Sequence, residues 1–198
     1  MDISIINSGS GNIGSLKNML NYLGFECNIC DCPEKLNTGK FIFLPGVGSF
    51  DGMVNSLKKK NFYNFLKHKN NYKDKMLIGI CVGMHVLFEK SEEGKEAGLE
   101  LINGKVKKFK NINLKLPHMG WNSVVGEAFY ENCNKMKFYF AHSYYVECEA
   151  NKIIAYSFYG KNFPSIIQSG NILGIQFHPE KSHVNGMELL RSIIQENK

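Results

Sequence analysis

Arginine is scarce in this chain, and long apolar runs are missing from it. Arg191 is the only arginine among the 24 basic residues that help give the 198-residue chain a net charge of +6. Readers of nucleic-acid phosphates and bases usually rely on arginine forks, so the lysine-rich segments 57–60 and 105–110 indicate solvated surface rather than a nucleic-acid site. No run of 18 apolar residues is present, and we therefore expect no membrane-spanning helix.

The opening residues, MDISIINSGSGN, lack a basic region followed by an apolar one. We therefore expect no secretory signal and a cytoplasmic protein. In that setting cysteines are expected as reduced thiols rather than as a disulfide framework. Cys30 and Cys32 are very close together and no matching pair follows, so no metal site is predicted. The six thiols are Cys27, Cys30, Cys32, Cys81, Cys133 and Cys148.

Apolar strands alternate with amphipathic helices along much of the chain. Segments 3–6, 41–46, 76–80 and 172–177 have the apolar character of buried strands, and segments 12–24, 49–69, 83–91 and 187–195 have helical spacing. Between about residues 99 and 160, short β-like segments dominate. This order predicts an α/β fold: a mostly parallel central sheet flanked by helices, with an antiparallel β addition in the middle. We expect one domain over residues 1–198.

The segment LIGICVGMHVLF (77–88) places Cys81 between Gly79 and Gly83, where a strand passes into a helix. A nucleophile on such a tight turn is exposed at the top of the sheet, and the flanking glycines let neighbouring backbone pass close by. The Val82 N–H is in position to stabilise an oxyanion, and the helix N-terminus favours a thiolate. The alternative is an ordinary buried cysteine in a β–α turn.

A base and an orienting group follow in GIQFHPEKS (174–182). His178 comes directly after a buried strand, and Glu180, two residues on, points the same way if the segment is extended. His178 can then take the thiol proton and be oriented by Glu180. In LPGVGSF (44–50), Gly46 and Gly48 permit a bend whose N–H groups supply a second oxyanion donor. The alternatives are a strand-end histidine that caps a carbonyl and a glycine-rich turn.

Together these motifs resemble the class I, or triad, glutamine amidotransferases, which have a flavodoxin-like fold. The finer resemblance is to the glutaminase subunits of imidazole glycerol phosphate synthases, enzymes of histidine biosynthesis. It spans essentially the whole chain. It rests on five ordered motifs: PGVGSF (45–50), GICVGM (79–84), PHMGWN (117–122), YFAHSYY (139–145) and GIQFHPEKS (174–182).

The resemblance implies that Cys81 attacks the amide carbon of glutamine, that His178 protonates the departing ammonia, and that Glu180 holds His178. It implies a (β/α)8-barrel cyclase partner in a heterodimer. Ammonia channelled there would yield imidazole glycerol phosphate and an aminoimidazole carboxamide ribotide. No cofactor, metal, nucleic acid or membrane is implied. The remaining roles are an oxyanion hole from Val47 and Val82, substrate contacts from Gly48, His85, His142, Ser143 and Tyr144, and a partner face from Asn12, Met119, Trp121 and Asn122.

Two departures from the family pattern qualify this hypothesis. His85 stands where the family usually has a substrate-contacting glutamine. A histidine can still donate a hydrogen bond, but its charge varies near neutral pH, so affinity or pH profile is expected to differ. Asn7 and Ser8 replace the usual Asp-Tyr in the opening motif. Paralogues that supply ammonia for bacterial surface-sugar synthesis stay open as an alternative.

Three rival hypotheses come from other classes of protein. Gly9, Gly11 and Gly14 fit the dinucleotide-binding pattern G-x-G-x-x-G, with Glu34 about twenty residues on. The strand before Glu34 is poor, and the alternation breaks where a second nucleotide-binding half is needed, so we favour a tight β–α turn. A stand-alone cysteine hydrolase would not need the partner face in PHMGWN. A non-catalytic binding subunit is disfavoured because all three triad residues are present.

Overall fold

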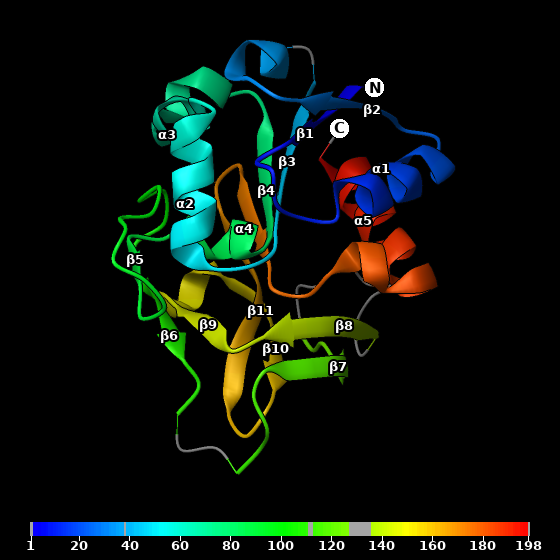
Figure 1. Cartoon of the computed structure of the whole chain (residues 1–198). Helices are drawn as coiled ribbons and strands as arrows, with labels where there is room; N and C mark the ends of the chain where they lie inside the picture. Colours follow the sequence, from blue (N-terminus) through cyan, green and yellow to red (C-terminus); the bar gives the residue numbers. More distant parts are fainter. Residues whose placement is uncertain (1, 38, 111–112, 127–135, 198) are drawn as a thin grey trace.

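A seven-stranded sheet forms the centre of the molecule (Figure 1). The computed structural model describes residues 2–37, 39–110, 113–126 and 136–197, so the expected thiol Cys133 lies outside the described residues. Five neighbouring strands are parallel: β2 (Glu26–Cys30), β1 (Asp2–Ile6), β3 (Phe41–Gly46), β4 (Met76–Cys81) and β12 (Ile172–Ile175). Two antiparallel strands complete the sheet: β11 (Asn162–Ser169) and β10 (Ile153–Phe158).

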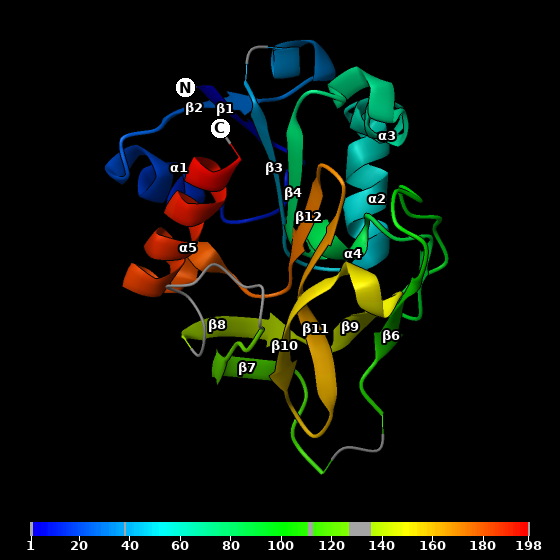
Figure 2. The ribbon, with the colours of Figure 1, turned by 180° about the vertical axis from the view of Figure 1, so that it is seen from behind.

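Helices cover both faces of the parallel strands, which explains why β3 and β4 are apolar and buried at every position. Helices α1 (Ile13–Tyr22) and α5 (His183–Glu196) lie on one face, and α2 (Phe50–Lys59) and α3 (Phe62–Lys67) lie on the other (Figures 1 and 2). Each packs an apolar stripe inward, such as Leu16 and Leu20 of α1. The predicted α/β fold is therefore confirmed. None of the helices within the described ranges is long and apolar enough to cross a membrane.

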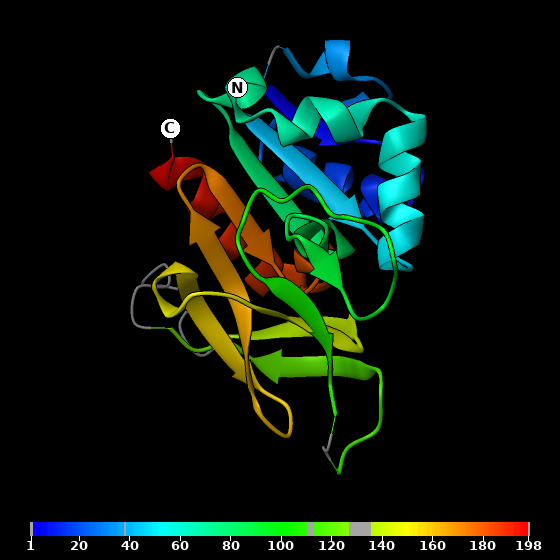
Figure 3. The same cartoon turned by 90° about the vertical axis from the view of Figure 1, so that its left-hand side faces the viewer.

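The predicted antiparallel addition lies beyond the carboxyl ends of the parallel strands (Figure 3). Strands β7 (His118–Ser123) and β8 (Lys137–His142) form an antiparallel pair, and β6 (Lys105–Lys108) pairs with β9 (Tyr144–Glu147) and with β5 (Lys90–Ser91). Strand β11 was not predicted, and with β10 it extends the central sheet. The described residues also form short 3₁₀ turns: η1 (Pro33–Asn37), η2 (Lys69–Tyr72), η3 (Ala150–Lys152) and η4 (Pro179–Lys181).

Two predicted helices are shorter than expected. The segment 49–69 is broken between α2 and α3 by Asn61, whose φ of 63° lies in the left-handed region that asparagine tolerates. The segment 83–91 forms only α4 (Val82–His85). The backbone that follows α4 is held instead by tertiary hydrogen bonds, from Leu99 N to Val86 O (2.7 Å) and from Leu101 N to Leu87 O (2.9 Å).

The glycine-rich turn after β1 has a structural explanation. Gly11 has a φ of 117°, and a Cβ there would lie 2.9 Å from Pro45 O, so the turn passes against the end of β3. One argument against a dinucleotide site was nevertheless wrong, because β2 is a regular strand before Glu34, in register with β1. Only Cys27 and Cys30 of β2 are buried. Such an edge strand has a weak apolar pattern.

Candidate active site

The tight turn at Cys81, called the elbow below, forms where β4 ends and α4 begins. Cys81 has φ 54° and ψ −111°, a strained backbone conformation for a residue with a side chain. A Cβ on Gly83 would lie 1.8 Å from Leu44 O, and one on Gly79 would lie 2.5 Å from Gly83 O. The flanking glycines are therefore needed for close backbone packing, as the sequence indicated. Because Gly46 pairs with Cys81 across β3 and β4, the Pro-Gly-Val-Gly loop begins beside the elbow.

His178 and Glu180 come together beside Cys81. His178 Nδ1 and Glu180 Oε1 are 2.8 Å apart, and both side chains are almost fully buried. The predicted pairing is present, but its geometric reason was wrong: Glu180 lies in the 3₁₀ turn η4, not on an extended strand. His178 is the residue before this turn, and its N–H donates to Tyr139 O (2.9 Å). Ser182 Oγ donates to His178 O at 2.6 Å and fixes the turn further.

Asn12 is a third residue hydrogen-bonded to the His178–Glu180 pair. It is the first residue before α1, but its side chain makes no capping hydrogen bond. Instead Asn12 Nδ2 donates to Glu180 Oε1 at 2.9 Å. An asparagine directly before a helix usually caps that helix. Here its amide binds the Glu180 carboxylate instead, which indicates that Asn12 helps to orient Glu180.

The charges of this cluster favour an ionised His178. Burial opposes the charged imidazole, yet interactions with Cys81 and with the Glu180 carboxylate raise the pKa of His178 to about 10. Burial likewise opposes ionisation of Glu180, but His178 and Asn12 hold the pKa of that carboxyl below its ordinary value. The arrangement therefore stabilises an imidazolium beside the thiol. Cys81 Sγ itself makes a long contact of 4.0 Å to Ala141 O.

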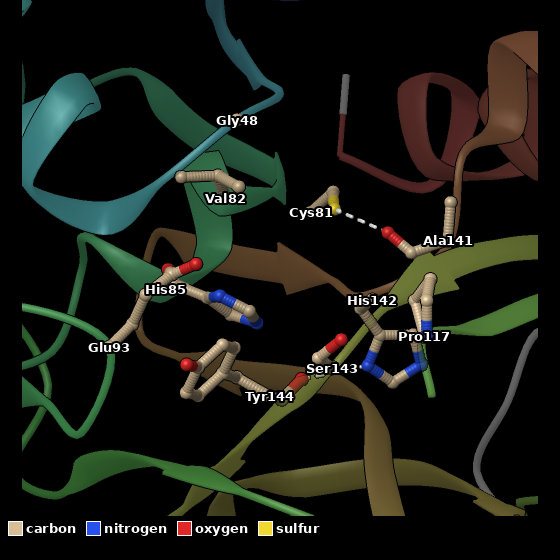
Figure 4. Close-up of a pocket in the computed structure, with 10 residues that line it drawn as sticks. All are labelled: Gly48, Cys81, Val82, His85, Glu93, Pro117, Ala141, His142, Ser143 and Tyr144. Carbon is tan, nitrogen blue, oxygen red and sulfur yellow. Dashed lines mark hydrogen bonds between the residues drawn. The ribbon is translucent and has the colours of Figure 1, made fainter. Parts of the chain in front are cut away.

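A pocket with a volume of about 170 Å³ opens at Cys81 (Figure 4). Seven of the residues predicted to bind or transform a substrate line it: Gly48, Cys81, Val82, His85, His142, Ser143 and Tyr144. The predicted oxyanion residue Val47 precedes Gly48 of the pocket and is exposed. Its N–H makes no hydrogen bond to any described residue, and Gly48 next to it has a φ of 93° with open space around it. Among the described residues, the Pro-Gly-Val-Gly loop therefore leaves an amide without a partner near Cys81.

Comparison with known proteins agrees with the geometry of this site. The family model described as glutamine amidotransferase class-I matches residues 4–196. The chain belongs to the class I glutamine amidotransferases. It is 44% identical to "Imidazole glycerol phosphate synthase subunit HisH 2" of Methanococcus maripaludis, over 98% of this chain and 99% of that protein. It is 42% identical to a HisH subunit of Leptospira interrogans, over 96% and 98%. At these identities the chain belongs to the HisH family within the class.

Solved structures agree on the fold. A structure described as a glutamine amidotransferase matches with a TM-score of 0.78 at 17% identity, over 98% of each chain. PurLQS from Thermotoga maritima matches with a TM-score of 0.76 at 16% identity, over 100% of this chain and 99% of that one. These structures confirm the fold, and the family model and the HisH relatives confirm the sequence-based resemblance to glutamine amidotransferases of the HisH type.

The amidotransferase pocket also contains Glu93, which the sequence analysis missed. Its carboxylate accepts the Phe50 N–H at 2.9 Å, and burial raises its pKa. The loop that carries it is fixed by Asp51, which accepts the Lys95 and Glu96 N–H groups at 3.0 Å. Figure 4 shows Glu93 and Tyr144 across the cavity from Cys81. A single glutamate in the charged stretch SEEGKE carries no signal of its own, so only the fold reveals it.

His85 behaves differently from what its residue type suggested. Burial lowers its pKa to about 4, so its charge does not vary near neutral pH. His85 Nε2 and Gln176 Oε1 are 2.8 Å apart, so His85 donates to the amide oxygen and keeps Nδ1 as an acceptor. Within the described part of the chain, His85 Nδ1 and Gln176 Nε2 are buried without a hydrogen-bond partner.

The residues predicted for a partner face divide into two groups. Met119 and Trp121 are exposed on β7. The Trp121 ring stacks on the His183 ring, with the two ring centroids 5.6 Å apart. The amides of Asn12 and Asn122 instead donate hydrogen bonds within the chain, Asn12 to Glu180 and Asn122 to Phe158 O at 2.8 Å. Among the residues that the structure describes, no cluster of histidine, cysteine and carboxylate side chains is arranged to hold a metal ion.

Proposed function

We propose that residues 1–198 form one glutamine amidotransferase domain that hydrolyses L-glutamine with Cys81, His178 and Glu180. It passes the ammonia to a (β/α)8-barrel cyclase subunit in a cytoplasmic heterodimer. The proposal rests on a series of side-chain hydrogen bonds that links Asn12 to Glu180 and Glu180 to His178. This series ends beside Cys81, which is held in a strained backbone conformation. The HisH relatives support the choice of acceptor.

The reaction needs two proton transfers at His178. The Cys81 thiolate attacks the amide carbon, and collapse of the tetrahedral intermediate breaks the C–N bond as His178 gives its proton to the leaving ammonia. The product is a γ-glutamyl thioester. Neutral His178 then takes a proton from water, whose oxygen attacks the thioester and releases glutamate and the thiolate. Glu180 holds the imidazole in the orientation and charge state that both steps need.

The tetrahedral intermediate carries an oxyanion that must be stabilised. The Val82 N–H is the first of α4 and has no partner within the helix. The Val47 N–H has no partner among the described residues, and open space around Gly48 allows that peptide to turn. Val47 and Val82 are therefore assigned to the oxyanion hole. Such a donor is worth about 3 kcal/mol of transition-state stabilisation in related acyl transfers.

The far end of the pocket suits the charged end of glutamine. The Glu93 carboxylate is the acidic side chain among the lining residues and pairs with the α-ammonium group. His85, a neutral ring, lines the pocket beside it. Gly48, His142, Ser143 and Tyr144 supply the remaining wall. This arrangement orients the side-chain amide toward Cys81.

The exposed residues of β7 support a docking face close to the triad. Trp121 packs edge-on against Tyr139, and the carbonyl of Tyr139 holds the backbone of His178. A partner that contacts β7 and β8 is therefore connected to His178, the proposed base, through the single hydrogen bond from the His178 N–H to the Tyr139 carbonyl. We expect the isolated chain to turn over slowly and the partner to accelerate it.

The test is glutamate release from glutamine by the full chain, with and without a histidine-pathway cyclase subunit and its ribotide ligand. Cys81→Ala is the control for contaminating glutaminase. We expect a large partner-dependent increase that the variant abolishes. Activity that survives in the variant would refute the nucleophile. Cys81-dependent activity that ignores this cyclase would instead favour a sugar-pathway partner or a stand-alone hydrolase.

A further inference from the structure

Two buried histidines outside the triad face each other across β7 and β8. His118 and His142 are paired in the strand register, and His118 Nδ1 lies 2.9 Å from His142 Nε2. His142 lines the glutamine pocket, whereas His118 does not. The chemistry proposed for Cys81, His178 and Glu180 uses neither ring.

The hydrogen bonds of this pair fix which nitrogen carries the proton. His142 Nδ1 lies 2.7 Å from Tyr144 O, and because a carbonyl oxygen only accepts, His142 must carry its proton on Nδ1. In the neutral ring, His142 Nε2 is then an acceptor, and the donor to it must be His118 Nδ1. His118 Nε2 is left as an acceptor, and Asn122 Nδ2 lies 3.3 Å from it as its donor.

Both rings are neutral near pH 7, which this assignment requires. Burial lowers the pKa of His118 to about 4 and takes that of His142 well below its ordinary value. The His118 ring is also held by stacking, 4.0 Å from the Tyr159 ring centroid and 4.8 Å from that of Phe140. The hydrogen bonds therefore run in one direction only, from Asn122 through His118 and His142 to the Tyr144 carbonyl.

We propose that His118 and Asn122 are positioning residues for glutamine binding: their one-way hydrogen-bond chain holds His142 and the His-Ser-Tyr backbone that forms the pocket wall. The proposal rests on the glutaminase function proposed for this site. It also ties the pocket to β7, the strand that carries the exposed Met119 and Trp121. Loss of the His118 donor leaves His142 Nε2 buried and unpaired, and the wall is then free to shift.

Two substitutions at position 118 separate hydrogen bonding from packing. His118→Phe keeps a ring between Tyr159 and Phe140 but has no donor. His118→Asn loses ring volume but keeps an N–H donor near the position of Nδ1. We would measure L-glutamine binding calorimetrically in the full chain carrying Cys81→Ser, which prevents turnover. We expect the phenylalanine variant to bind about tenfold more weakly or worse, and the asparagine variant to stay within about threefold of the parent.

A purely structural role reverses this order, because phenylalanine preserves packing better than asparagine. Equal affinities, or tighter binding by His118→Phe, would overturn the positioning role. The wild-type chain gives a second readout through the ¹⁵N shifts of its histidine rings. We expect protonated Nδ1 and bare Nε2 in both His118 and His142, and the opposite form of His142 would overturn the chain. A parent that binds no glutamine would count against the proposed function itself.

Discussion

At the residue scale, Cys81, the proposed nucleophile, lies on strained backbone. Its φ of 54° and ψ of −111° are the mirror image of an extended conformation that L-residues favour, so only glycine adopts them without strain. Such strain costs on the order of 1–3 kcal/mol and persists only where the surroundings enforce it. Here β3 and β12 enforce it, because both pair with β4 up to the elbow.

This strain predicts a difference between two inactive variants. Cys81→Gly should be more stable toward urea unfolding than Cys81→Ala by about 1 kcal/mol, because glycine relieves the strain and alanine does not. Both lack the proposed nucleophile, so glutamate release should fall to background in each. The free energies of unfolding decide the matter. Equal stability of the two variants would mean that the elbow imposes no strain.

Single residues differ in how far the sequence alone reveals them. Cys81, His178 and Glu180 were predicted because each lies in a motif whose local geometry has a chemical meaning. Asn12 was assigned to a partner face, yet its amide binds Glu180, 168 positions away in the chain. Glu93 was not predicted at all. The contacts of Asn12 and Glu93 are tertiary, and no local pattern encodes such contacts.

At the scale of elements, the site depends on how closely α4 packs between β3 and β4. A Cβ on Gly83 would overlap the Leu44 carbonyl, with 1.8 Å to its oxygen and 2.9 Å to its carbon. Both atoms belong to backbone at the centre of the sheet and cannot move aside. The elbow and the sheet are therefore built as one unit.

Two glycine-to-alanine substitutions test this packing. Gly83→Ala should lower the free energy of unfolding by more than about 3 kcal/mol, beyond the usual range for one substitution. Gly14→Ala, on α1 with nothing within 4 Å of the added Cβ, should raise it by about 0.5–1 kcal/mol. Thermal and urea unfolding of the two variants give the comparison. A tolerated Gly83→Ala would show that α4 can move away from β3.

Elements were predictable where the apolar pattern was long and locally consistent, as in β3, β4 and α5. Other elements were predicted wrongly or missed because tertiary contacts or a proline outweigh the local apolar pattern. The segment after His85 has helical spacing, but its backbone bonds to residues 98–102 instead. Strand β11 lies in a stretch broken by Pro164, which hides it from a periodicity argument.

At the scale of the whole molecule, the active site and the exposed face of β7 form a continuous unit. Tyr139 connects them: its ring contacts Trp121, and its carbonyl binds the His178 N–H. Met119 and Trp121 are 64% and 47% exposed, which is unusual for large side chains close to the buried cluster of Cys81, His178 and Glu180. The partner surface proposed above would account for that exposure, because buried aromatic anchors dominate interface energies.

The last prediction concerns this face. Trp121→Ala should weaken binding to the cyclase subunit by about 2 kcal/mol or more, roughly thirtyfold in Kd, because tryptophan anchors are typical hot spots. Tyr22→Ala is the matched control: Tyr22 is 78% exposed at the end of α1 and belongs to no proposed site, so the partner affinity should stay within about twofold. Titration calorimetry with the cyclase subunit measures both. If the two variants bind alike, the docking face lies elsewhere, and the link from Trp121 through Tyr139 to His178 cannot carry activation by the partner.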